Sequence, residues 1–347
     1  MKMHKYPSID QFRTIVKQVR SSASFDGKDE NGEPIYDITK KSPILKFTGT
    51  VKLHGTNSAI CFNFGDYSNY WCQSRERIID PYTDNAGFAT YVYSHKDMYE
   101  LIFSKIESDM SNTITDIENY SGVAIYGEWC GGNIQKGVGI NGLPKMFVVF
   151  GLKLISQHDD QANLWVPLTT YSLTNHQINL YSINEFDTFS IDIDFNEPEL
   201  SQNILINTTI SVENECPVAK YFGINGIGEG IVWECIHNGT IYRFKTKGEK
   251  HSISKVKVLV PIDIEKVNTI KDCVNNIVTE QRLSQGLSYF RENGVSMDIK
   301  NTGKFIKWVN DDIIKEELDV IVGSGLEVKD VLSSASKKSK EWYFNII

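Results

Sequence analysis

The strongest constraint on how this chain folds is a short polar turn between two strand-like segments. Residues 44–51 and 58–64 are rich in β-branched and aromatic side chains in partial alternation, which favours two β-strands. Between them stands Lys52-Leu53-His54-Gly55-Thr56-Asn57, a run that holds a primary amine, an imidazole and a glycine. We therefore expect Lys52 where a strand breaks into a turn, with Gly55 allowing a ligand to approach the backbone.

A lysine in such a turn has two interpretations. A lysine amine attacks phosphorus only when it is neutral, so a nucleophilic lysine needs a site that lowers its pKa from about 10.4 by desolvation or by nearby cations. The alternative is an exposed lysine in a β-turn, which is the commoner case for an isolated Lys-x-x-Gly. Other segments of the chain decide between the two.

The turn matches the nucleophile motif Lys-x-(Asp/His)-Gly-(Thr/Ser)-Asn, and five further segments follow in a recognisable order. They are Gln73-Ser74-Arg75, Ile125-Tyr126-Gly127-Glu128, Phe147-Val148-Val149-Phe150, Glu229-Gly230-Ile231-Val232 and Phe244-Lys245-Thr246-Lys247. Each segment is weak alone, but six in order between Lys52 and Lys247 are specific. Together they resemble the RNA ligase 2 family of ATP-dependent RNA ligases, which are covalent nucleotidyltransferases.

The resemblance implies a three-step reaction. Lys52 attacks ATP and becomes a lysyl-AMP, the AMP passes to the 5′-phosphate of RNA, and a 3′-hydroxyl then expels AMP to form a phosphodiester. ATP carries about four negative charges, so displacement at its α-phosphorus needs cations, a task that suits Lys245 and Lys247. His54 is expected to orient a phosphate or the metal shell.

The other motif residues suit contacts with the nucleotide and with a metal ion. Mg²⁺, or Mn²⁺ in its place, prefers carboxylates and water, so Glu229 is the leading ligand, while Glu128 binds metal or accepts from a ribose hydroxyl. Arg75 suits the 5′-phosphate or the ribose, and Asn57 positions a phosphate. Phe150 is expected to stack on adenine, with Phe147 or plain core packing as alternatives. The resemblance is imperfect at two positions, since relatives commonly carry glutamate where Val51 stands and often aspartate where Gly151 stands.

Length and periodicity indicate an α+β protein of two domains. A chain of 347 residues exceeds the ~250–300 residues that one core usually serves. We expect a nucleotidyltransferase (ATP-grasp-like) domain of antiparallel sheets with helices over residues 1–258, because the motifs lie there. After Pro261 apolar residues recur at helical spacing, which predicts a small all-helical domain over residues 259–347. Its expected role is to recognise RNA, for which the candidate contacts are Lys304, Lys307 and the Lys337-Lys338-Ser339-Lys340 cluster.

Local signals predict further elements. Ser8-x-x-Gln11 resembles a capping box that opens a helix to about Gln18, and residues 24–42 are typical of a loop. A helix is expected near Ala89–Ile106. Gly137-x-Gly139-x-x-Gly142 formally matches a dinucleotide fingerprint, but Pro144 follows where that fingerprint needs a helix, so we reject it.

Composition indicates an intracellular enzyme with a local basic surface. The net charge is −8, yet the segment from Arg243 to Lys257 carries a formal +5, and alternation on a strand would put Arg243, Lys245 and Lys247 on one face. The six cysteines include no Cys-x-x-Cys pair, which predicts reduced thiols rather than a disulfide framework or a zinc site. No apolar run is long enough to span a bilayer. We expect a cytoplasmic monomer (host cytoplasm if virus-encoded) that acts on RNA with 3′-hydroxyl and 5′-phosphate ends, at nicks in duplex RNA.

Three other functions stay open. A DNA ligase usually has aspartate where His54 stands, and a capping-type guanylyltransferase would be expected to have a β-rich C-terminal domain. A catalytically inactive RNA-binding relative would have lost the nucleophile. Transfer of label from ATP, but not from GTP, to the protein would separate these functions best.

Overall fold

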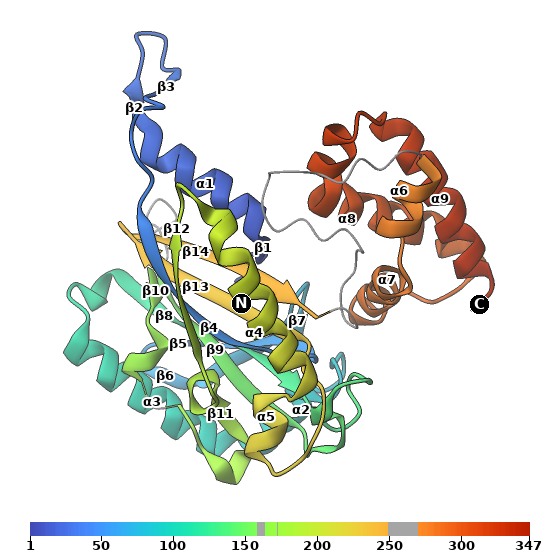
Figure 1. Ribbon diagram of the computed structural model, residues 1–347. Coiled ribbons are helices and arrows are strands. Elements are labelled where there is room, and N and C mark those ends of the chain that lie inside the picture. Colours follow the sequence, from blue (N-terminus) through green and yellow to red (C-terminus); the bar gives the residue numbers. More distant parts are fainter. Residues whose placement is uncertain (158–163, 172, 249–269) are drawn as a thin grey trace. The chain divides into compact units, whose positions relative to one another are not determined.

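The computed structural model describes residues 1–157, 164–171, 173–248 and 270–347, and these residues form an α+β fold (Figure 1). They group into two compact units. The first unit comprises Met1–Ser8, Thr50–Thr188 and Asn214–Glu229, and the second comprises Ile9–Gly49, Phe189–Glu213 and Gly230–Ile347. Among the described residues, no helix has the length and apolar character to cross a membrane.

The first unit is built on a seven-stranded sheet in the order β10-β9-β8-β5-β6-β7, with β11 beside β9. Neighbouring strands are antiparallel, except that β11 runs parallel to β9. The strands are β5 (Thr56–Asn63), β6 (Asp66–Ser74), β7 (Ile78–Ile79), β8 (Tyr120–Cys130), β9 (Met146–Ser156), β10 (Leu164–Val166) and β11 (Leu180–Ser182).

Alternation along these strands divides their side chains between two faces. On one face Phe62 of β5 stacks on Phe103 of a helix, with 4.5 Å between ring centroids, inside the main apolar core. Two helices cover this face, α2 (Phe88–Ser94) and α3 (Lys96–Thr113). We expected one helix near Ala89–Ile106, but the chain leaves helical geometry at His95, where φ is −115° and ψ is 31°.

The other face of the same sheet carries a smaller apolar cluster, and the first residues of the chain lie against it. Gln73 exchanges two hydrogen bonds with the backbone of His4, and the Tyr126 hydroxyl donates to the His4 carbonyl at 2.9 Å. The Tyr6 ring packs on Tyr126 and on Phe150, with centroid separations of 5.2 and 5.0 Å. These contacts fix the N-terminal segment beside Phe150.

The second unit contains a five-stranded sheet in the order β1-β14-β13-β4-β12. Its buried face is covered by α1 (Phe12–Ser24) and α4 (Gln202–Asn214): Phe12 packs on Phe244 with centroids 4.9 Å apart, and Thr209 donates to the Thr246 hydroxyl at 2.7 Å. The strands are β1 (Asp10–Gln11), β4 (Ile44–Lys52), β12 (Phe189–Asp194), β13 (Gly230–His237) and β14 (Thr240–Lys247).

Two local predictions near the N-terminus are wrong. The helix begins at Phe12 rather than at Ser8, because Asp10 and Gln11 pair with β14 as a parallel strand, and Gln11 makes no side-chain cap. Residues 24–42 are not a simple loop, since β2 (Phe25–Lys28) and β3 (Pro34–Tyr36) form an antiparallel hairpin. The turn residues of this segment mark the tip of the hairpin, and the sequence signal for its short strands is weak.

The chain from residue 270 onward is helical, as the periodicity predicts. The helices α6 (Ile270–Ile277), α7 (Glu280–Glu292), α8 (Thr302–Gly323) and α9 (Val328–Phe344) enclose a separate apolar core that includes Phe290, Phe305 and Tyr343. The expected domain boundary at 258–261, with Pro261, lies outside the described residues.

The formal dinucleotide fingerprint does not form a nucleotide-binding unit. Gly139–Gly142 is a single 3₁₀ turn, and no α-helix follows it before β9 begins. A short helix, α5 (Pro217–Tyr221), lies near the end of the first unit. The segment thus lacks the helix with which a Rossmann fingerprint continues.

Candidate active site

The predicted nucleophile stands at the end of a strand. Lys52 is the last residue of β4, residues 53–55 form the turn, and β5 begins at Thr56. Along β4 the buried residues alternate with more exposed ones, so Lys52 shares its face with Lys46 and Thr48 and is opposite Phe47. The strand thus presents the Lys52 amine away from its apolar side.

A buried carboxylate holds the lysine amine. The Lys52 Nζ donates to Glu229 Oε2 at 2.8 Å, and His54 Nδ1 lies 3.3 Å from the same oxygen. The Glu229 side chain is 3% exposed, whereas 23% of the Lys52 side chain is exposed. The amine is therefore fixed on one side by an ion pair and stays open to a ligand on the other.

Glu128 holds the turn itself. Its Oε1 accepts the Gly55 backbone N–H at 3.0 Å, and Glu128 stands opposite Asn57 in the β5–β8 register. A hydrogen bond between a carboxylate and a backbone amide is among the stronger ones in proteins. Glu128 therefore positions the nucleophile turn directly.

Gly55 is required by space on the protein side. A Cβ at this position would lie 2.4 Å from the Trp129 carbonyl oxygen and 2.7 Å from the Cys130 Cβ. The close approach is therefore that of β8 to the turn. The sequence predicts that Gly55 leaves room for a ligand. The structure adds a second reason for the glycine, which is the space that β8 occupies beside the turn.

The two candidate stacking residues lie on opposite faces of the sheet. Phe147 is fully buried in the main core beside Phe88, at 4.8 Å between centroids. Phe150 is half-buried at the margin of the smaller cluster, where Tyr6 meets it edge to face. Only Phe150 of the two is accessible to a base. A Cβ at Gly151 would approach Trp165 and Tyr6 at 3.3 and 3.4 Å, so aromatic rings crowd the position where relatives often carry aspartate.

Arg75 lies at the surface beside Glu76. It follows β6, its side chain is 54% exposed, and its Nε lies 3.7 Å from Glu76 Oε1. An exposed guanidinium of this kind is available to an oxyanion.

The two C-terminal motif lysines lie on β14 of the second unit. Tyr242, Phe244 and Thr246 are buried, whereas Arg243, Lys245 and Lys247 alternate with them on the other face, as predicted. Lys247 pairs in register with Gly230, the residue after Glu229, and Arg243 forms an ion pair with Glu234. Lys245 Nζ lies 3.0 Å from Glu316 Oε1. The remaining basic residues of the predicted run, Lys250, Lys255 and Lys257, are outside the described residues.

The cysteines are not catalytic. All six are free and buried. Burial raises the pKa of the Cys130 thiol well above 9, with the nearby Glu128 charge adding to the effect, so this thiol stays protonated.

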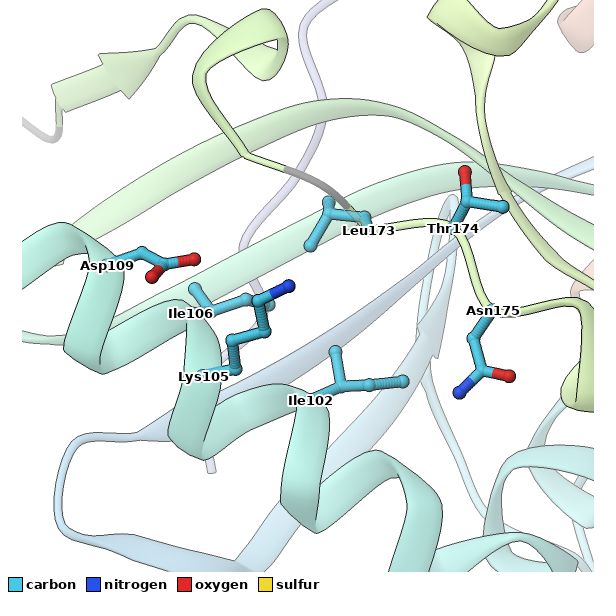
Figure 2. A pocket seen from close by; sticks show the side chains of 7 residues that line it. All are labelled: Ile102, Lys105, Ile106, Asp109, Leu173, Thr174 and Asn175. Atoms are coloured by element: carbon cyan, nitrogen blue, oxygen red, sulfur yellow. The ribbon is translucent and has the colours of Figure 1, made fainter.

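A separate small pocket of about 130 Å³ lies between α3 and residues 173–175 (Figure 2). Side chains of α3, among them Lys105 and Asp109, line one side of it, and Leu173, Thr174 and Asn175 line the other. None of the motif residues lines this pocket, so it is separate from the site around Lys52 and Glu229.

Two residues that contact the predicted site residues were not expected from the sequence. Tyr6 packs on Phe150, and Glu316 pairs with Lys245. Neither belongs to a motif. Only the three-dimensional contact shows their involvement.

The family described as RNA ligase matches residues 45–257, a segment that contains every motif from Lys52 to Lys247. This match covers more than half of the sequence. The chain belongs to the RNA ligase family. Its sequence matches no curated protein.

Solved structures of an RNA ligase from Naegleria gruberi resemble this RNA ligase family member. A mutant with AMP and Mn aligns at 13% identity and a TM-score of 0.40, over 72% of this chain and 56% of that one. A mutant with ATP and Mn gives 13% identity and 0.40 over 72% and 57%, and an apo mutant gives 14% and 0.41 over the same shares. The chain thus spans little more than half the length of these structures.

Proposed function

We propose that this chain is an ATP-dependent RNA ligase that works through a covalent lysyl-AMP on Lys52. The observation that carries the proposal is the Lys52 amine, which a buried Glu229 holds at 2.8 Å with His54 on the same oxygen. An isolated surface lysine has no such support. The arrangement suits an amine that must be aligned before it attacks phosphorus.

In the first step the Lys52 amine passes a proton to Glu229 Oε2, 2.8 Å away, and its nitrogen attacks the α-phosphorus of ATP. A P–N bond forms, and the bond from the α-phosphorus to the bridging oxygen breaks as pyrophosphate leaves. The RNA 5′-phosphate then attacks the adenylate and releases the lysine. Finally the 3′-hydroxyl loses its proton to solvent as its oxygen attacks the activated 5′-phosphorus, and AMP departs with the electron pair of the broken bond.

Lys245 and Lys247 are proposed to stabilise the charge that develops on the phosphates, and Phe150 to stack on adenine. Asn57 and Arg75 would contact the phosphate and the ribose. Glu128 acts by fixing the nucleophile turn through Gly55.

The donor set suits a magnesium ion that is held mainly by water and phosphate. No cluster of three or more metal-ligating side chains occurs among the described residues, and Mg²⁺ typically uses one or two carboxylates with substrate phosphates. Glu229 would be the direct or water-mediated ligand, and Glu128 the second candidate. Such an ion, or Mn²⁺, neutralises charge on the phosphates.

We further propose that residues 1–258 form the adenylyltransferase domain, and that residues 259–347 recognise the RNA, with nicked duplex RNA as the substrate. Helices α6–α9 have their own apolar core, as a substrate-recognition module requires. Lys304, Lys307 and Lys337–Lys340 are the candidate backbone contacts. Sealing of a nicked RNA duplex at a rate well above that of a nicked DNA duplex is the expected result, and equal rates would favour a DNA ligase.

The decisive test is transfer of label from radioactive ATP to the protein. Lys52→Ala and Lys52→Arg should both abolish labelling, because a guanidinium stays protonated near neutral pH and cannot attack phosphorus. Lys46→Ala is the matched control, since Lys46 lies on the same face of β4 and is exposed. Undiminished labelling of either Lys52 variant, or equal labelling by GTP, would refute the proposal.

A further inference from the structure

One of the proposed phosphate-binding lysines already has an anion beside it. Lys245 Nζ lies 3.0 Å from Oε1 of Glu316, a residue of α8 in the C-terminal helical region. The Glu316 side chain is 6% exposed, whereas 20% of the Lys245 side chain is exposed. A ligand from solvent can therefore reach the lysine but has little access to the carboxylate.

Glu316 is held firmly in this position. Its other carboxylate oxygen accepts from the Gln11 side-chain amide, and its backbone carbonyl accepts from Gln11 and from Arg13. Burial would raise the pKa of Glu316, but the Lys245 charge and the hydrogen bond from Gln11 outweigh it and lower the pKa to about 2. The carboxylate is thus ionised at neutral pH.

Charged side chains make up the neighbouring contacts between α8 and α1. Arg13 lies 3.5 Å from Glu317 and 3.0 Å from Asp319, and Lys17 lies 3.4 Å from Asp319. Relative motion is expected across contacts between parts of a chain that are polar rather than apolar. In this contact the Arg13–Glu317 pair is buried, with side chains 5% and 2% exposed, whereas Asp319 is 37% exposed.

A phosphate at Lys245 and the carboxylate of Glu316 would compete for one positive charge. Two like charges about 5 Å apart repel each other appreciably at the effective dielectric constants found near protein surfaces. We propose that the Glu316 carboxylate competes with the phosphates of the nucleotide for the Lys245 ammonium. The lysine would then pair either with Glu316 of α8 or with a phosphate, but not with both at once. The inference rests on the proposed function, because it takes Lys245 to be a phosphate ligand.

Linkage makes the effect reciprocal. If docking of α8 weakens phosphate binding, phosphate binding weakens the docking of α8 by the same factor. Entry of ATP would then loosen the helical region before the RNA step begins. Glu316 thus couples adenylylation of Lys52 to the mobility of helices α6–α9, the proposed RNA-recognition region.

The test compares Glu316→Gln with Asp311→Asn in the full chain. Asp311 lies on the same helix and makes only an exposed pair with Lys307, at 2.7 Å, in the described contacts, so its substitution leaves Lys245 untouched. Glu316→Gln removes the charge and keeps the shape. For labelling of Lys52, the KM for ATP should fall about tenfold in Glu316→Gln, with kcat within about twofold, and should not change in Asp311→Asn.

An unchanged or higher KM in Glu316→Gln, or loss of its labelling, would overturn the inference. Absence of labelling in the unmodified protein would instead refute the proposed function. A second measurement needs no variant at Glu316. Pyrophosphate should accelerate amide hydrogen exchange in peptides from α1 and α8 of the unmodified chain, whereas unchanged or slower exchange would contradict the competition.

Discussion

The close approach of β8 to the nucleophile turn makes Gly55→Ala a sharp test of the site geometry. The added Cβ would lie 2.4 Å from the Trp129 carbonyl oxygen, about 1 Å short of an ordinary contact. A backbone oxygen in a strand cannot rotate away, so the turn itself must shift by about this distance. A displacement of about 1 Å at a reacting group can reduce the rate about 100-fold. Overpacking of this kind typically costs 1–3 kcal/mol of stability.

We therefore expect Gly55→Ala to fold but to label with ATP about 100-fold more slowly than the unmodified protein. The measurement is a single-turnover time course with radioactive ATP at saturating concentration, together with thermal unfolding. Gly142→Ala is the control, because a Cβ there has no neighbour within 4 Å. Labelling of Gly55→Ala at nearly the normal rate would show that the turn tolerates the shift, and the reasoning from the close approach would be wrong.

Three further outcomes are expected. Glu229→Ala and Lys247→Ala should each reduce sealing by at least ~100-fold, with Glu234→Ala on β13 as the control; near-normal sealing by either variant would remove that residue from the site. Phe150→Ala should raise the KM for ATP, whereas Phe147→Ala should lower the free energy of unfolding by about 3–5 kcal/mol, since only Phe147 is fully buried; the reverse pattern would exchange their roles. Burial, with the charges of Lys153 and Lys2, lowers the pKa of His4 to about 4 in the folded protein. As pH drops from 6.5 to 4, His4 is therefore protonated in the unfolded chain before it is protonated in the folded one, and the free energy of unfolding should fall by up to about 3 kcal/mol. His4→Gln should flatten that dependence in thermal unfolding, and an equally steep curve would exclude His4 as its source.

The parts of the fold that follow from local pattern were predictable. The strand that ends at Lys52 and the basic face of β14 both rest on a period of two, which the sequence displays directly. The helices after residue 270 likewise rest on helical periodicity. In these segments burial of one face is what creates the pattern, so the pattern reports the structure.

Other parts depend on contacts between residues that are far apart in the chain. Asp10 and Gln11 become a strand only because β14 lies beside them, more than 230 residues later. The sequence analysis favours Phe150, but which of Phe150 and Phe147 stays accessible depends on how each sheet face is covered, because both are aromatic residues in one strand. Glu316 resembles any other acidic residue of an amphipathic helix until its contact with Lys245 is seen. No sequence pattern encodes such pairings.

Because all six cysteines are buried, the native protein should react little with thiol reagents at its own cysteines. Because burial also raises the pKa of these thiols, maleimide dyes should react with them slowly. Two surface substitutions, Ser21→Cys on α1 and Val322→Cys on α8, would then accept a donor and an acceptor dye selectively in the native protein. Energy transfer between the dyes would follow the separation of these helices in single molecules during each round of catalysis.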